Sequence, residues 1–102
     1  MHHFKAEFFK TLSHPTRLRI LDALRAGELS VGEVQEKLEL SQSTASQHLA
    51  ALRERDLVEA RRAGTSVWYR VSDTAIWELL DLARDIYERQ LLKNRATFEA
   101  LQ

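Results

Sequence analysis

Hydrophobic residues recur at intervals of three and four along most of this chain, and this spacing predicts helices. Stripes of this kind run through residues 4–12, 15–26, 30–38, 41–54 and 73–92. Between residues 57 and 71 the pattern changes to a period of two, which predicts two strands around a tip that contains Gly64. The sequence therefore predicts a mostly α protein with one small β-hairpin.

Two capped helices separated by a short turn lie in the middle of the chain. Ser30 and Glu33 have the spacing of a capping box, and Ser41 can accept a hydrogen bond from an amide of the following first turn. Glu39 and Leu40 form the turn between them, without the usual glycine. Residues 30–54 therefore have the spacing of a helix-turn-helix unit.

The second of these helices carries small polar side chains where a solvated helix would carry Lys and Glu. Its apolar stripe faces inward, and its outward positions are Ser43, Ser46, Gln47 and Ala50. Short polar side chains permit close approach in a DNA major groove, where Gln can bond to adenine with both ends of its amide. The alternative is a serine-rich surface helix, and the neighbouring segments decide between the two.

The hairpin predicted over residues 57–71 carries three arginines near its tip, Arg61, Arg62 and Arg70. A solvated hairpin could carry these residues by chance, but after a DNA-reading helix they indicate a wing that contacts phosphate or the minor groove. The chain has no net charge, yet residues 41–72 hold five arginines against three acids. Residues 73–102 hold four basic and six acidic residues, so the positive charge lies in the DNA-reading part.

The first and last long helices carry more apolar surface than one small domain can cover. An exposed patch of that size is rare on a monomer, so we expect residues 4–12 and 73–92 to close a two-fold dimer. Ordinary packing is the alternative for the first helix. Residues 93–102 predict a weak extra turn or a short helix. The expected interface residues are Phe4, Phe8, Leu12, Leu80, Ala83, Ile86 and Tyr87.

Four segments in this order resemble the ArsR/SmtB transcriptional repressors: SHPTRLRIL (13–21), LSVGEV (29–34), SQSTASQHL (41–49) and VWYRV (67–71). The resemblance extends from residue 4 to residue 92 and implies a winged helix-turn-helix fold. It further implies a homodimeric repressor that leaves a double-stranded DNA operator when an effector binds, and we expect that operator to be an imperfect palindrome. The residues expected to contact DNA are Gln42, Ser43, Thr44, Ser46, Gln47, His48, Arg61, Arg62 and Thr65. Among them His48 is also expected to be half-buried and structural.

The known metal sites of that family have lost their ligands in this chain. Its arsenic and cadmium sensors place two cysteines where this chain has Ser30 and Gly32. Its zinc and nickel sensors use Asp-x-His and His-x-x-Glu in the long helix. This chain keeps the first aspartate there and has Ala75, Ile86 and Arg89 at the other positions. We expect no metal or cofactor at these sites.

The effector is left open by the sequence. His2 and His3 follow the amino terminus, where a histidine at the third position can help bind Cu(II) or Ni(II) in a square plane, although a frayed polar terminus is the simpler interpretation. The alternatives are an organic ligand near the dimer interface and no effector at all.

Composition excludes several classes of protein. A chain of 102 residues suffices for one domain, and the absence of cysteine excludes disulfides, thiolate metal sites and cysteine redox sensing. Four scattered histidines and no glycine-rich phosphate loop leave no enzyme site. No apolar run reaches membrane-spanning length and no signal peptide is evident, so we expect a cytoplasmic protein. A winged-helix adaptor that binds protein instead of DNA remains the alternative function.

Overall fold

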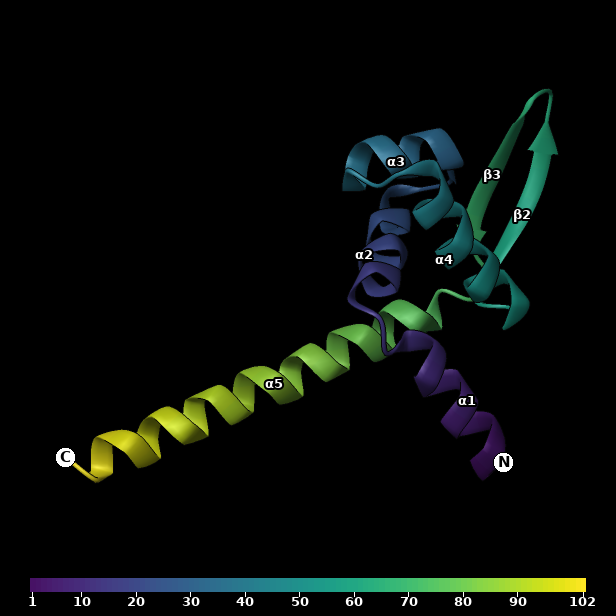
Figure 1. Ribbon diagram of the computed structural model, residues 1–102. Helices are drawn as coiled ribbons and strands as arrows, with labels where there is room; N and C mark the ends of the chain where they lie inside the picture. The colour runs from purple at the N-terminus through teal and green to yellow at the C-terminus, as the bar shows by residue number, and fades with distance from the viewer.

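Five helices and a three-stranded sheet make up the fold (Figure 1). The computed structural model describes residues 1–102. The helices are α1 (His2–Leu12), α2 (Pro15–Ala23), α3 (Val31–Leu38), α4 (Gln42–Glu54) and α5 (Ala75–Ala100), and a short 3-10 turn, η1 (Leu24–Ala26), follows α2. The strands are β1 (Leu29–Ser30), β2 (Val58–Ala63) and β3 (Ser66–Val71). The predicted fold class, mostly helical with a small hairpin in winged-helix order, is confirmed.

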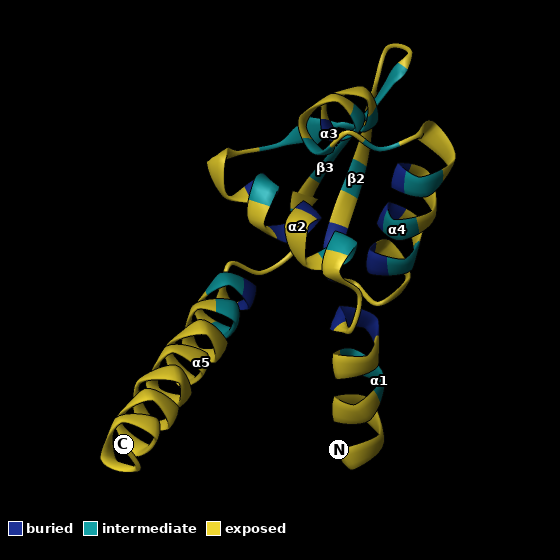
Figure 2. Cartoon of the chain, turned by 60° about the vertical axis from the view of Figure 1, so that its left-hand side comes forward, coloured by how far each residue is buried: buried dark blue, intermediate teal, exposed yellow.

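The core lies where α2, α3 and α4 pack against one another and against the base of the sheet. Seven of its side chains are almost completely removed from solvent, namely Ile20, Leu21, Leu24, Val34, Leu49, Leu52 and Val58. Burying one such side chain stabilises the fold by about 1.5–3 kcal/mol before the entropy of ordering is counted. Figure 2 shows that the buried positions gather in this part of the molecule, which we call the body.

Local hydrogen bonds fix the ends of α3 and α4 as the sequence predicts. The Glu33 amide donates to Ser30 Oγ at 3.1 Å while the Ser30 amide donates to the Glu33 carboxylate at 3.2 Å, which completes the capping box. The Thr44 amide donates to Ser41 Oγ at 3.2 Å. Between the helices Glu39 adopts a left-handed φ of 56°, a conformation that glycine usually supplies at a helix end. The helix-turn-helix unit is therefore present with glutamate in its turn.

The sheet joins the wing to the start of the helix-turn-helix. Strands β2 and β3 are antiparallel and run in register from Val58 opposite Val71 to Ala63 opposite Ser66, so the tip is shorter than predicted. Strand β1 pairs antiparallel with the other edge of β3, with Leu29 opposite Tyr69. The sequence did not predict β1, because two residues are too few to show alternation and their partners, Tyr69 and Trp68, lie 40 and 38 positions away.

Helix α5 corrects the prediction for the end of the chain. The sequence predicted a helix over residues 73–92 and at most a short separate piece after it, whereas the structure has one continuous helix of 26 residues, Ala75–Ala100. No glycine or proline interrupts this segment, so nothing in it stops the helix. Thr74 is its N-cap residue, and the carboxylate of the preceding Asp73 accepts from the Ala75 amide at 2.9 Å. None of the helices combines the length and the apolar character needed to cross a membrane.

Candidate nucleic-acid interface

Helix α4 presents the small polar face that its sequence predicts. Ala45, Leu49 and Leu52 are fully buried against the body, whereas Ser43 and Gln47 are exposed. At 100° per residue the last two lie almost opposite the buried stripe. No charged or bulky side chain occupies this outer face over the first two turns, so the helix can approach another surface closely.

One flank of α4 faces the wing across a groove of about 430 Å³. Gln42 and Ser46 line it from α4, while Thr65 and Ser66 line it from the hairpin tip. The start of α3 forms the rest of its wall. Figure 1 shows the hairpin projecting beside α4 on the same side of the body. The structure thus brings the predicted residues of helix and wing to one surface.

The other flank of α4 is joined to the body through His48. Arg17 Nε donates to His48 Nδ1 at 3.1 Å, and Arg17 Nη1 donates to the Thr11 carbonyl at 3.1 Å. Burial lowers the pKa of His48, and the positive charges of Arg17 and of His14, whose ring centroid is 5.9 Å away, act in the same direction. His48 therefore accepts a hydrogen bond through Nδ1 and is half-buried, as predicted. Its contact with phosphate stays a prediction.

Sequence reasoning missed the role of Arg17 in this connection. The hydrogen bond joins residues 31 positions apart, and nothing in the sequence of α2 distinguishes Arg17 from Arg19, which donates instead to the Leu38 carbonyl at 3.1 Å. A pattern along one helix cannot show such a partner. Arg17 holds the recognition helix against α1 and α2, so it positions the face that we expect to contact DNA.

The wing arginines lie on opposite faces of the sheet. Residues that pair directly across two strands share a face, so Arg61 lies with its partner Trp68, and Arg62 lies with its partner Val67. Val67 and Tyr69, which share the second face, also line the groove beside α4. Arg62 is therefore on the face of the hairpin that looks toward the recognition helix, and Arg61 is on the other.

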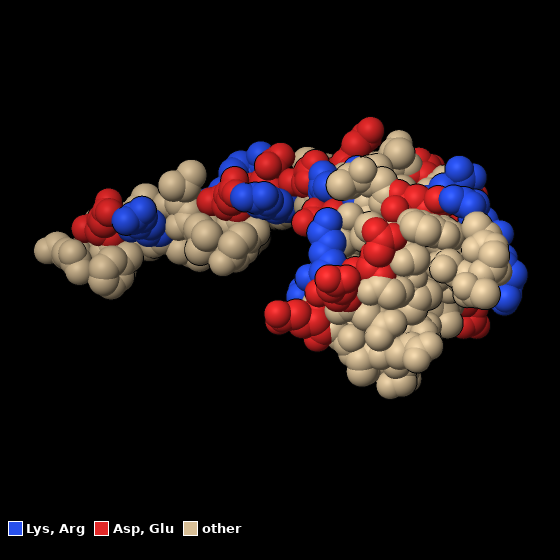
Figure 3. All heavy atoms as spheres, turned by 90° about the horizontal axis from the view of Figure 1, so that it is seen from above, with Lys and Arg blue, Asp and Glu red and all other residues tan.

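The two arginines also differ in their partners. Arg61 Nε lies 3.0 and 3.1 Å from the two carboxylate oxygens of Glu28, and Nη2 donates as well. Arg70 forms an ion pair of 2.9 Å with Glu59 on the same face. Arg62 takes part in no ion pair within the chain. Figure 3 shows basic side chains at the right-hand edge of the body, and further basic side chains at its other end and along α5. Arg62 is therefore the wing arginine that is free to contact phosphate.

Known proteins with this sequence pattern and fold are transcriptional regulators. Residues 12–61 match the family described as a helix-turn-helix domain. The chain is 42% identical to the HTH-type transcriptional regulator Rv0081 of Mycobacterium tuberculosis, over 100% of this chain and 90% of that protein. It is 39% identical to the transcriptional repressor SmtB homologue of Synechocystis, over 72% of this chain and 56% of that protein. The chain belongs to the ArsR/SmtB family.

Solved structures support the same assignment. The crystal structure of Rv0081 superposes with a TM-score of 0.83 and covers 91% of this chain and 94% of its own. The solution structure of the homodimeric winged helix-turn-helix DNA-binding domain Mb0332 of Mycobacterium bovis has a TM-score of 0.78 at 35% identity, over 87% of this chain and 82% of its own. The family consists of transcriptional regulators rather than enzymes, so the resemblance read from the sequence is confirmed.

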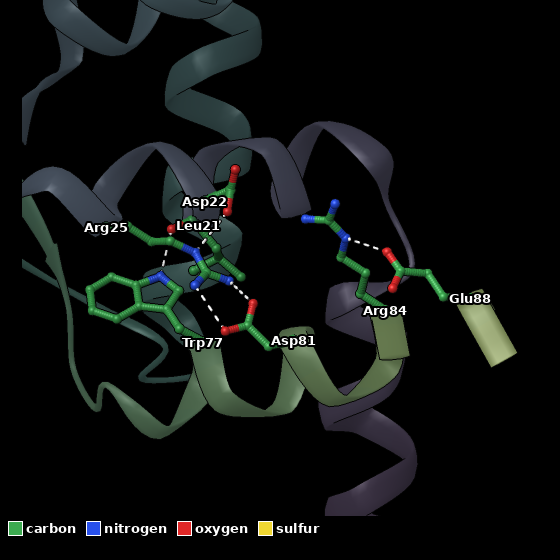
Figure 4. Close-up of polar contacts among 7 residues, drawn as sticks. All are labelled: Leu21, Asp22, Arg25, Trp77, Asp81, Arg84 and Glu88. Carbon is green, nitrogen blue, oxygen red and sulfur yellow. Dashed lines mark hydrogen bonds and ion pairs between the residues drawn. The ribbon is translucent and has the colours of Figure 1, made fainter. Parts of the chain in front are cut away.

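In this ArsR/SmtB-family chain the start of α5 is fastened to α2 and η1 (Figure 4). Arg25 forms ion pairs with Asp81 at 2.6 Å and with Asp22 at 2.7 Å, and its guanidinium lies over the ring of Trp77. The indole N–H of Trp77 donates to the Leu21 carbonyl at 2.8 Å. The hydrogen bond from Arg25 lowers the pKa of Asp81, so this carboxylate stays charged near neutral pH. These contacts join the start of α5 to the body.

The helices expected to form the dimer interface leave large apolar side chains in solvent. Phe4 is 65% exposed, Ile86 46% and Tyr87 59%, whereas every side chain of the core is less than 10% exposed. Leu12 differs from the prediction, because it is 6% exposed within the single chain and therefore belongs to the protomer's core. Phe8 and Leu80 are partly covered by that core. That the exposed residues among them contact a partner chain stays a prediction.

No group of three metal-binding side chains is assembled in this regulator. The one carboxylate kept from the family's long-helix site, Asp73, accepts a hydrogen bond from the Ala75 amide. His2 and His3 lie in the exposed first turn of α1. The expectation that metals do not control the protein stays a prediction, which zinc and cadmium titrations of the DNA complex would test.

Proposed function

We propose that this protein is a homodimeric repressor that binds an imperfect palindromic operator in double-stranded DNA in the cytoplasm. The observation that carries the proposal is the small polar face of α4, which is exposed beside a groove that it shares with the wing. A surface of this shape suits a major groove, with the wing on the adjacent backbone. Membership of a family of transcriptional regulators favours this function over a protein-binding adaptor.

Base reading falls to the outward and wing-facing positions of α4. Gln47 stands at the centre of the exposed face, and Ser43 lies one turn before it. Gln42 and Ser46 face the wing across the groove. A glutamine amide can bond to the N6 and N7 edge of adenine, while serine hydroxyls bond to several bases. Gln47 is therefore the side chain from which we expect most of the sequence discrimination.

Phosphate contacts fall to the wing and the flanks of α4. Arg62 and Thr65 lie on the wing, and Thr44 and His48 lie along the flank that faces α2. Phosphate contacts fix the register of the protein on the duplex but carry no sequence information themselves. The wing therefore adds affinity and orientation to the discrimination supplied by α4.

The dimer supplies the second half-site. A two-fold axis through α1 and α5 would cover the exposed Phe4, Ile86 and Tyr87 of both chains. It would also place two recognition helices about one DNA turn apart, so the operator should contain two related half-sites. The relative Mb0332 is homodimeric, which supports this arrangement.

An unidentified organic effector is compatible with the structure. A hollow of about 310 Å³ lies among Phe8, Leu57, Ile76 and Leu79, at the junction of α1, α5 and the segment that follows α4. Its size is near the lower limit for small-molecule sites, and a ligand there would touch α1, α5 and the segment that follows α4. Thermal-shift screening of amphipathic compounds, followed by operator release, would identify one.

Selection of DNA fragments from the source genome tests the proposal. Retained fragments and random duplexes are compared by fluorescence anisotropy at a fixed 0.15 M salt. We expect the selected site to bind about 10³-fold or more tightly than random DNA. A reporter gene behind that site should be turned down by the protein. Equal affinity for selected and random DNA would favour the adaptor, and an increase in reporter expression would make the protein an activator.

A further inference from the structure

We infer that Glu28 restricts how much of the wing's positive charge acts on DNA, because it holds Arg61 in a two-point ion pair on the far side of the sheet. The inference rests on the proposed DNA binding and assigns a regulatory role within it. Glu28 is not expected to touch DNA itself. It is a positioning residue that acts through Arg61.

The pair is built into the sheet. Glu28 immediately precedes β1. The pairing of Leu29 with Tyr69 holds the start of β1, and with it Glu28, beside the middle of β3. The Glu28 side chain is 25% exposed, less than that of any other acid in an ion pair of this chain. Both carboxylate oxygens bond to Arg61, whose guanidinium also lies 5.9 Å from the centroid of Trp68. Two neighbours therefore hold Arg61 in one orientation.

The matching contrast lies one residue further along β2. Arg62 has a similar position near the hairpin tip but no acidic partner, and it shares its face with the groove beside α4. The third wing arginine, Arg70, is paired with Glu59. Of three arginines on the hairpin, the structure leaves a single one unneutralised. The positive balance of residues 41–72 is therefore smaller in the folded protein than in the sequence, because Glu28 comes from outside that segment.

Neutralising Arg61 has a measurable consequence for DNA binding. Each phosphate contact releases counterions, and the logarithm of the binding constant falls with the logarithm of salt concentration by about 0.9 per contact. A contact of this kind strengthens binding to every sequence equally. Keeping one arginine per protomer off the phosphates thus limits capture of the protein by random DNA, which is present in large excess over any operator.

Four proteins test the inference: the wild type, Glu28→Gln, Glu28→Gln/Arg61→Ala and Glu99→Gln. Glutamine keeps the shape of the side chain and removes its charge. Glu99→Gln is the matched control, because it makes the same change beside Arg95, near the far end of α5. Binding of each dimer to the selected operator and to random duplex is measured from 0.05 to 0.3 M salt, with thermal melting as a check on folding.

For Glu28→Gln we expect tighter binding to both DNAs, on the order of tenfold per protomer near 0.1 M salt, and a slope steeper by about 0.9 per protomer. The double variant should return to the wild-type slope, and Glu99→Gln should match the wild type throughout. An unchanged slope for Glu28→Gln, an equal gain for Glu99→Gln, or a gain that survives in the double variant would overturn the inference. A wild type that binds no DNA would instead overturn the proposed function.

Discussion

The apolar side chains of this regulator are buried in the body but largely exposed on the two projecting helices, α1 and α5. In the body Ile20, Leu21 and Leu49 are fully buried, and the fold closes on itself. In α1 Phe4 and Phe9 are more than half exposed, and along α5 the large apolar side chains from Leu82 onward are about half exposed or more. Figure 2 shows both helices leaving the body with exposed surfaces. The core of the body is closed within one chain, whereas the helices that leave it carry apolar side chains that we expect a second surface to cover.

This difference indicates that the two parts have different functions. The body orients α4 and the wing through contacts within one chain, such as the bond from Arg17 to His48. We expect the projecting helices to place a second body at a fixed distance, and the contacts of Arg25 and Trp77 join α5 to α2 and η1. Substitutions in the two regions should therefore have different effects. A substitution in the body should change which bases each protomer recognises, and one in the projecting helices should change whether two half-sites are bound together.

The largest effect is expected at the projecting helices. Ile86→Glu would bury a charge twice at the two-fold axis, at a cost of several kcal/mol per ion. The variant should be monomeric, keep the melting behaviour of the body and bind the operator with nearly random-site affinity. Light scattering and anisotropy measure these properties, and Ile86→Leu is the matched control that should remain dimeric. A dimeric, operator-specific Ile86→Glu protein would remove α5 from the interface.

A smaller effect is expected at the centre of the recognition face. Gln47→Ala should cost about 1–3 kcal/mol on the operator and little on random duplex, because a base-edge contact discriminates and a phosphate contact does not. Random DNA is the internal control in the same titration, and the variant should stay dimeric. Equal losses on both duplexes would show that Gln47 contacts backbone rather than bases.

The wing supplies the next effect. Arg62→Ala should weaken binding to all sequences and reduce the salt slope by about 0.9 per protomer, because one phosphate contact is lost from each chain. The specificity ratio should be unchanged. If the slope of the variant equals that of the wild type, Arg62 does not lie on the DNA.

The smallest effect concerns pH and the connection between α4 and α2. Burial lowers the pKa of His48 below its ordinary value of 6.5, so the folded state takes up this proton less readily than the unfolded state. The contribution of neutral His48 is present above pH 6.5 and is lost as the pH falls through the folded-state pKa. The melting temperature should therefore fall between pH 7.5 and 5.5, less steeply in His48→Asn, while His3→Asn keeps the wild-type profile. Parallel profiles for His48→Asn and the wild type would contradict this role.

What the sequence predicted correctly was set by local rules. The caps at Ser30 and Ser41 join residues three positions apart, and the hairpin follows from alternation around Gly64. What it missed depends on chain segments that meet only after folding, such as the pairing of β1 with β3. The end of α5 was missed for a different reason, because residues 93–100 have a weak apolar stripe but nothing that ends a helix.

The candidate site shows the same division. The outward face of α4 was predictable because helical geometry alone places Ser43 and Gln47 opposite the buried stripe. The inequality of Arg61 and Arg62 was not, since it depends on sheet register and on Glu28, 33 positions away from Arg61. Leu12 was assigned to the interface on its spacing with Phe8, yet packing within the chain had already buried it.

Footprinting on a fragment retained from the source genome tests the central claim most directly. The account predicts one protected region containing two related half-sites with centres about one helical turn apart, or a multiple of it, bound by two chains. Ile86→Glu should lose the protection at the same concentration. Protection of a single asymmetric half-site by one chain, or no fragment bound more tightly than random DNA, would contradict the account.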